Sequence, residues 1–453
     1  MSDTALTATL DSVTRDLLAA ARAAGADAAD AVAIEERALS VDIRKGALEH
    51  AERAEGLDIG LRVFVGQRQA CISSSDTRPE TLQAMAARAV AMAREAPEDP
   101  HAGLADPQQL AARRDAEGLE LFDPGDELSP EVLAEHAQRA EAAALEVPGV
   151  AQVQAASAAQ TRQSIWLAAS NGFSGGYMRS GHHLSCVAIS GEGTGMERDY
   201  AAEGRIFAAD LPSPEEIGAL AGARTASRQG ARRPKTGTYP VLFDERIAAS
   251  LIGHLLSAIN GAAIVRGSSW LRDAMGTQVL PRGLSLHENP LRPRSSGSRP
   301  FDAEGLGSYA RDLVSDGVLQ GWVLDLSSAR KLGLGSTASA SRGTSGPPQP
   351  SISNVALTQG PHSRDALIAQ MGTGLLVTSM IGSTINPTTG DYSRGASGFW
   401  VENGEMTYPV NECTIAGNLR EMLLRIIPAN DARPHLSRVV PSLLVEGMIL
   451  AGE

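Results

Sequence analysis

The chain has 453 residues, with 40 Lys and Arg against 53 Asp and Glu, which gives a formal net charge of −13. This length predicts two to three domains, and 43% hydrophobic with 21% charged residues excludes a disordered chain. Because so acidic a surface repels phosphate backbones, we expect no direct nucleic-acid partner.

Cysteine usage and the lack of apolar segments predict a cytoplasmic protein. Cys71, Cys186 and Cys413 lie far apart without a CxxC pair, which is typical of a reducing compartment. The N-terminal residues lack the basic and apolar regions of a signal peptide. The nearest approach to a membrane span, residues 248–265, contains Ser, His and Asn, so we expect a buried helix and no membrane partner.

The fold class predicted from the element pattern is α+β, starting with an N-terminal α+β domain over residues 1–100. Apolar periodicity and turn residues give its elements. In chain order they are a helix over 4–24 that ends at Gly25, strands over 31–34, 39–43 and 57–65, a strand from Cys71, and a helix over 79–94.

Residues 101–128 are rich in Pro, Asp and Gly and are predicted to form a linker or wrapping segment. A central α+β region over 129–236 follows. It begins with a helix over 130–144, for which Ser129 is the N-cap and Pro130 the first residue, and continues with strands over 150–187 and a helix over 214–228. A basic run, Arg224, Arg228, Arg232, Arg233 and Lys235, is interpreted as an exposed helix end and linker.

Residues 237–453 are predicted to form a β-rich C-terminal domain around a buried central helix over 248–265. A strand over 239–243 precedes this helix and many short strands follow it. The low-complexity stretch 335–350 interrupts these strands, and we interpret it as a long loop rather than a domain boundary.

The central helix carries a stripe of small and polar residues but only one metal-ligand type. Ser250, His254, Ser257 and Gly261 recur at spacings of four, three and four on an otherwise apolar helix. Two interpretations stay open. His254 is either a hydrogen-bonded core histidine beneath a close helix contact, or the remnant of a metal-binding helix that has lost its other ligands.

Other candidate motifs are weak. His182 and Cys186 share one strand face but would lie ~13 Å apart, which is too far for one metal ion. Ser328 and Lys331 match the pattern SxxK without its companion motifs.

The block from Asn386 to Leu419 is the strongest functional candidate. Its density of Gly, Asn, Asp and Pro predicts tight turns. We interpret Asn386–Asp391 as one turn and expect another over Asp391–Gly395. Arg394 beside Gly395 presents a planar donor fork that suits a carboxylate or peptide carbonyls. The alternative is that Asp391 and Arg394 pair with each other and brace their own turn.

Several stretches resemble the TldD/PmbA peptidase family, and within it the PmbA/TldE branch. They are residues 60–68, 73–76, 91–94, 171–173, 183–186, 195–200, 301–305 and 329–333, together with the block 386–419. The resemblance implies a heterodimeric cytoplasmic peptidase that degrades unfolded or extended peptides and matures peptide antibiotics. Its TldD-like member holds one metal ion, expected to be zinc, through an HExxxH helix and a downstream Cys. Older names call the PmbA branch a modulator of DNA gyrase.

This sequence departs from the metal-binding member of the family. The helix over 248–265 offers only His254, and residues 439–444 contain no Cys where the metal-binding branch places one. The resemblance therefore implies that this chain holds no metal and no catalytic residue, and that it pairs with a TldD-like HExxxH subunit. The residues expected to wall the shared peptide cavity are Asp391, Tyr392, Ser393, Arg394, Gly395 and His254.

Two other functions stay open at this point. The chain could act as a homodimeric binding or scaffold protein, for instance a modulator of gyrase-directed toxins. It could also be an enzyme in its own right, with a site around His254 or Ser328.

Overall fold

The computed structural model describes residues 3–453, and its first half is built on one six-stranded antiparallel sheet. The strands are β1 (Ala28–Arg44), β2 (Ala47–Val65), β3 (Arg68–Ser74), β4 (Val150–Ala169), β5 (Ser174–Ser190) and β6 (Glu197–Arg205). They lie in the order β3-β2-β1-β4-β5-β6. The pairing of β1 with β4 joins the segments 1–100 and 129–236 in a single sheet, while the domain boundaries themselves stay predictions.

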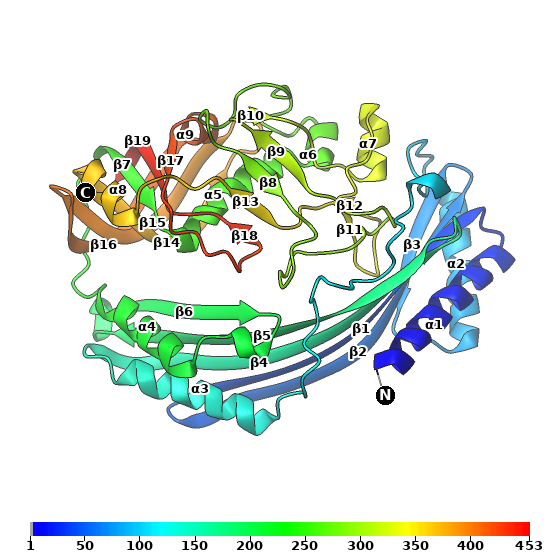
Figure 1. Ribbon diagram of the computed structural model, residues 1–453, viewed down its shortest axis with the longest axis horizontal. Coiled ribbons are helices and arrows are strands. Elements are labelled where there is room, and N and C mark those ends of the chain that lie inside the picture. Colours follow the sequence, from blue (N-terminus) through cyan, green and yellow to red (C-terminus); the bar gives the residue numbers. More distant parts are fainter. Residues whose placement is uncertain (1–2) are drawn as a thin grey trace.

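Four helices cover the convex face of this curved sheet (Figure 1). They are α1 (Asp3–Ala23), α2 (Pro79–Glu95), α3 (Pro130–Leu145) and α4 (Pro214–Ala226). Alternate residues of β1 supply the apolar floor, because successive side chains of a strand point to opposite faces. Ala31 and Ala33 pack in the cluster that holds α1 and α2, whereas Val41 and Ile43 pack with α3 and α4.

Strand β1 differs from its prediction, which placed two strands at 31–34 and 39–43. The structure has one strand of 17 residues that runs through the polar stretch between them. It stays extended because β2 and β4 pair with it on both sides along that stretch, where Arg37 also bonds to Glu35.

Segment 101–128 crosses the concave face of the sheet with no element longer than the 3-10 turn Pro107–Gln109. The backbone of β5 holds it in place: Gly176 N donates to Arg114 O, and Ser180 N donates to Leu121 O, both at 3.0 Å. The segment thus lies between the sheet and the second half of the chain.

The second half faces the concave side of the sheet and contains a closed ring of five strands (Figure 1). The ring consists of β7 (Gly237–Phe243), β14 (Gly374–Ile385), β15 (Asp391–Glu402), β16 (Glu405–Asn418) and β19 (Leu443–Ala451), with β17 (Ile426–Pro428) added beside β19. A second sheet has the order β10-β9-β8-β13-β18. Its strands are β8 (Leu286–Glu288), β9 (Arg311–Ser315), β10 (Val318–Leu319), β13 (Val355–Leu357) and β18 (Arg438–Val439).

The helices of the second half are short apart from α5. They are α5 (Glu245–Ala258), α6 (Gly261–Val265), α7 (Leu326–Leu332), α8 (Arg364–Met371) and α9 (Leu419–Leu423). The apolar side of α5 packs into the largest core cluster, which contains Leu251 and Leu255 of α5 together with Val377 and Trp400 of the strand ring. The mixed α+β class predicted from the sequence is thereby confirmed.

The predicted continuous helix over 248–265 was wrong in one respect, since it breaks after Ala258. Asn260 leaves the helical conformation, and its side chain accepts a hydrogen bond from Ala262 N and so caps α6. Gly261 N donates to Val323 O instead of continuing the α5 ladder. Within residues 3–453, no helix is long and apolar enough to cross a bilayer.

The loop 335–350 folds back onto the concave face through the hairpin β11 (Ala340–Ser341) and β12 (Gln349–Pro350). Its tip lies so close to β2 that a Cβ added to Gly60 would stand 2.2 Å from Thr344 O. Only glycine at this position leaves room for the loop.

Gly60→Ala should therefore displace the loop tip and lower the free energy of unfolding by about 1–3 kcal/mol, the usual cost of overpacking. Limited proteolysis at the loop and chemical denaturation would measure both effects. Gly56→Ala is the matched control on the same strand, because its added Cβ would meet nothing within 4 Å. Equal behaviour of the two variants would contradict this packing.

Candidate functional site

Three of the six predicted site residues come together around β15. Tyr392 and Arg394 lie on one face of the strand, and His254 approaches them from α5. The rings of His254 and Tyr392 meet edge to face at 5.8 Å, and the Tyr392 hydroxyl donates to Met380 Sδ at 3.3 Å. We call His254, Met380, Tyr392 and Arg394 the β15 cluster.

The other three predicted residues belong to the opposite face of β15, since faces alternate along a strand. The prediction of a turn over Asp391–Gly395 was wrong, because these residues pair with β14 and β16 on both sides. The turn predicted over Asn386–Asp391 is present just before them, where Asn386 Oδ1 accepts from the backbone N of Thr388 and Thr389. Asp391 is exposed, and Ser393 and Gly395 are half-buried.

Asp391 and Arg394 bond to different partners. The Asp391 carboxylate accepts from Thr389 Oγ1 at 2.6 Å and from Asn418 Nδ2 at 3.1 Å, so it stabilises the turn. Arg394 Nε donates to Gly382 O at 2.7 Å, across to β14. The alternative in which the two side chains pair with each other was therefore wrong.

Burial and a nearby cation set the protonation of the β15 cluster. Burial raises the pKa of Tyr392 to about 12, although the Arg394 charge lowers it somewhat, so the phenol keeps its proton at neutral pH. Burial, and then the Arg394 charge, lower the pKa of His254, which leaves its imidazole neutral. His254 Nε2 is buried and has no hydrogen-bond partner among the described residues.

The β15 cluster does not fit a zinc ion. Zinc in proteins takes imidazole, thiolate and carboxylate ligands. Here one imidazole stands beside a phenol, a thioether and a guanidinium cation, and the cation opposes a second positive charge. Among the described residues, no group of three or more His, Cys, Asp and Glu is placed to hold a metal ion.

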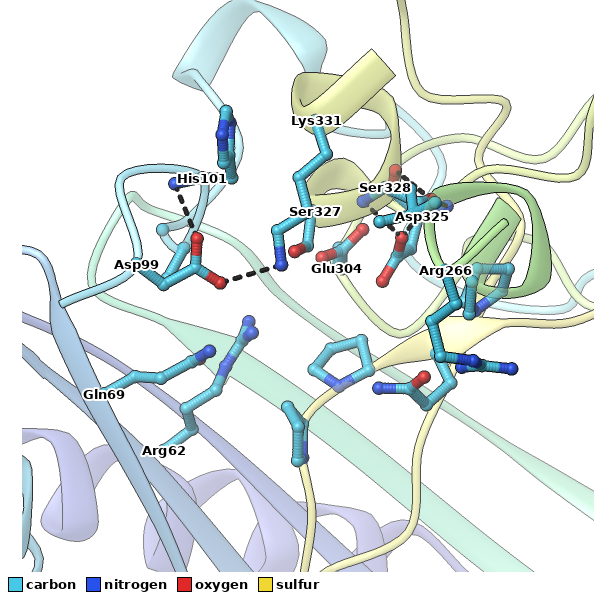
Figure 2. Close-up of a pocket in the computed structure, with 18 residues that line it drawn as sticks. Arg62, Gln69, Asp99, His101, Arg266, Glu304, Asp325, Ser327, Ser328 and Lys331 are labelled. Atoms are coloured by element: carbon cyan, nitrogen blue, oxygen red, sulfur yellow. Dashed lines mark hydrogen bonds and ion pairs between the residues drawn. The ribbon is translucent and has the colours of Figure 1, made fainter. Parts of the chain in front are cut away.

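Cys413, Ser328 and Lys331 make structural contacts. Cys413 is buried, its thiol donates to Ala396 O at 3.2 Å, and burial raises its pKa to about 11. The Ser328 hydroxyl donates to the Asp325 carboxylate, which caps the first turn of α7. Lys331 Nζ lies 3.0 Å from Asp99 Oδ2 and is thus not available as a base for Ser328 (Figure 2).

A polar cavity of about 250 Å³ lies where α7 and the loop 347–350 face β2, and its lining residues are drawn in Figure 2. Arg62 and Glu304 line it, and both are buried. Burial, and then the neighbouring Asp302, raise the pKa of Glu304 to about 8.

Sequence reasoning did not select Arg62, Asp302 or Glu304 as site residues. The sequence did offer a signal for these residues, because they lie in the stretches 60–68 and 301–305, which resemble the TldD/PmbA family. Their chemistry depends on contacts between distant segments, which a local pattern does not show.

Comparison with known proteins agrees with this architecture over nearly the whole chain. Models of the PmbA/TldA metallopeptidase match domain 1 at residues 29–93, the central domain at 123–229 and the C-terminal domain at 236–452. Metalloprotease PmbA of Escherichia coli O157:H7 is 38% identical over 429 residues, which cover 94% of this chain and 93% of that protein. A metalloprotease TldD homolog of Haemophilus influenzae is 25% identical over 290 residues, 61% of this chain and 60% of that protein.

Solved structures show the same fold. A protein from Bacteroides thetaiotaomicron described as a modulator of DNA gyrase superposes with a TM-score of 0.90 at 26% identity, over 98% of both chains. TldE from Thermococcus kodakarensis superposes with a TM-score of 0.84 at 21% identity, over 97% of this chain and 100% of that one. The chain therefore belongs to the PmbA/TldD metallopeptidase family.

Proposed function

We propose that this chain is the non-metal subunit of a TldD/TldE-type heterodimeric peptidase that acts on unfolded or extended peptides and processes peptide antibiotics and toxins. The observation that carries the proposal is the β15 cluster, whose donors suit a peptide and do not suit a zinc ion. The family supports it, because a TldD homolog stands among the relatives of this chain. The metal, expected to be zinc, would belong to the TldD-like partner and supply the Lewis acid there.

The β15 cluster can bind and orient a peptide. The Tyr392 hydroxyl donates to Met380 Sδ and can accept from a peptide amide. The neutral His254 imidazole can donate to a peptide carbonyl or accept from a peptide amide. Arg394 adds a charged donor that strengthens a hydrogen bond to a carbonyl or carboxylate. These groups bind and orient the peptide, and none of them transfers a proton during hydrolysis.

The test compares this chain alone with this chain co-purified with an HExxxH-bearing sibling. We expect peptide hydrolysis and bound zinc, measured by mass spectrometry, only in the pair. Hydrolysis by the lone chain that a chelator abolishes would overturn the proposal. A stable homodimer that does not bind the sibling would instead favour the second candidate, a homodimeric binding or scaffold role. The similar Bacteroides protein is described as a modulator of DNA gyrase, which is the observation that favours this second candidate.

The same complex tests the role of the β15 cluster. Arg394→Ala should lower kcat/KM for an extended peptide by about 10- to 100-fold, the range for one charged hydrogen bond of 1.5–3 kcal/mol. Arg420→Ala is the control, because Arg420 is an exposed arginine of the same domain. Gel filtration would show that both variants assemble. Unchanged turnover in an assembled Arg394→Ala complex would exclude the cluster from substrate binding.

A further inference from the structure

A second cavity, of about 270 Å³, lies between the concave sheet face and the C-terminal half of the chain. One wall is apolar and the other is cationic. Ile34 of β1, Ile165 and Leu167 of β4, and Tyr177 and Phe301 form the apolar wall. Their floor is continuous because Ile34 pairs with Ile165 and Tyr177 pairs with Ile165 from the other side.

Guanidinium groups form the opposite wall, and two of their buried N–H groups have no hydrogen-bond partner among the described residues. Arg299 donates through Nη1 to Ala340 O at 3.2 Å and through Nη2 to Ser351 O at 2.9 Å, which leaves Nε without a partner. Arg342 donates through Nη1 to Asp30 and leaves Nη2 without a partner. The Arg342 side chain is only 1% exposed, so bulk water does not satisfy it.

A buried N–H without a partner costs free energy, and it costs more on a charged group. The loop 335–350 nevertheless holds Arg342 in this position. A ligand that accepts hydrogen bonds from both arginines would remove that cost. Since the donors are cationic and planar, the acceptor they suit is an oxyanion such as a carboxylate.

The carboxylates near the cavity do not neutralise all of the positive charge of its arginines, so an additional anion is favourable there. Asp30 is shared between Arg62 and Arg342, so two cations face one anion. Asp302 also lines the cavity, but its oxygens accept from the backbone N of Glu304, Leu306 and Ala340. Arg179 adds a third guanidinium to the lining, and its Nη2 donates to the carbonyls of Ser296 and Ser298.

We propose that this cavity binds a carboxylate next to an apolar side chain, as found at the C-terminus of a peptide that ends in an aliphatic residue. The carboxylate would bond to Arg299 Nε and Arg342 Nη2, and the aliphatic side chain would lie against Ile34, Ile165 and Leu167. The volume lies below the ~300–1,000 Å³ of drug-sized pockets, which fits a single terminal residue. The site is separate from the β15 cluster and does not depend on the proposed peptidase function.

The experiment titrates the full chain, without any partner, with acetyl-alanyl-leucine as the free acid and as its amide, by calorimetry. The acid should bind with a dissociation constant on the order of 0.1–1 mM, and the amide about 10- to 100-fold more weakly, because it lacks the charge. Equal affinity of acid and amide, or no binding of the acid at about 10 mM, would overturn the proposal.

Two variants locate the binding. Arg342→Met removes one donor while Asp30 keeps Arg62 as its partner, and Ile165→Phe fills the apolar end without touching the arginines. Each should weaken binding of the acid by about tenfold or more. Ala159→Leu is the control, since Ala159 lies on the same strand and lines a different cavity. Thermal unfolding would show that each variant is folded, and tight binding to a folded Arg342→Met would refute the site.

Discussion

Replacing Asp30 by Asn should lower the free energy of unfolding by about 3–5 kcal/mol, because the change leaves two buried guanidinium groups without a counter-charge. Asp30 is 2% exposed. Its Oδ2 accepts from Arg62 Nε at 2.8 Å, and its Oδ1 accepts from Arg342 Nη1. Asn keeps the shape of the side chain, so the expected loss is electrostatic rather than steric.

Because the pKa of Asp30 is shifted in the folded chain, the stability difference between the parent chain and Asp30→Asn should depend on pH. Burial alone raises this pKa, but the charges of Arg62 and Arg342 outweigh burial and hold it below its usual range. A depressed carboxyl pKa stabilises the fold above the pKa of the unfolded chain, and this stabilisation is lost as the pH falls. The difference between the parent chain and Asp30→Asn should therefore shrink in acid.

Guanidinium denaturation followed by circular dichroism would measure this difference. Asp58→Asn is the matched control, because Asp58 is exposed on the neighbouring strand, and exposed substitutions usually stay within about 0.5 kcal/mol. If Asp30→Asn were as stable as Asp58→Asn at neutral pH, the buried ion pairs would not contribute as described.

Local signals predicted the boundaries of the helices in the first half of the chain well. Ser129 and Pro130 were predicted to begin a helix, and in α3 the Ser129 side chain accepts from Val132 N at 3.4 Å. Such a cap depends on residues three apart in the chain, so the sequence itself contains the whole interaction. The mixed fold class followed from the same kind of pattern.

Features that depend on distant residues were not predictable in this way. Arg228 was interpreted as part of an exposed basic run, yet its side chain is 8% exposed. It bonds to Ser397 Oγ, 169 residues away, and lies near Glu197 and Asp199. A basic residue in such a run becomes buried when an acidic residue far away in the chain packs against it in the fold. The local sequence pattern does not show which distant residues come together.

The candidate site shows the same division. His254, Tyr392 and Arg394 were named as site residues from the sequence. The contact of His254 with Tyr392 joins residues 138 positions apart in the chain, and it is a property of the fold. The pairing of Asp30 with Arg342 spans 312 residues and has no local signal. The strand alternation that separates Asp391 from Arg394 followed only once the segment was known to be a strand.

We expect the free energy of unfolding of the parent chain to fall as the pH rises, and Glu304→Gln should remove most of this fall. Glu304 is 8% exposed, and its Oε2 accepts from Leu326 N at 2.8 Å. Burial and then Asp302 raise its pKa from 4.5 to about 8, against the lowering effect of Arg62. Burial also raises the pKa of Asp302, so the pair keeps a proton that the unfolded chain releases.

The sign follows from proton linkage. Between pH 4.5 and about 8 the folded state binds more protons than the unfolded state, so the free energy of unfolding falls as the pH rises. One proton gives a slope of about 1.4 kcal/mol per pH unit. The stabilisation is fully present below pH 4.5 and is lost as the pH rises through about 8.

Denaturation curves at several pH values from about 5 to 9 would give this slope for Glu304→Gln, for the parent chain and for Glu446→Gln, an exposed control. We expect the slope to become smaller only in Glu304→Gln. An unchanged slope in that variant would show that Glu304 is not the group that holds the proton. If the slope then became smaller in Asp302→Asn, the proton would belong to Asp302, since two coupled carboxyls titrate as one pair.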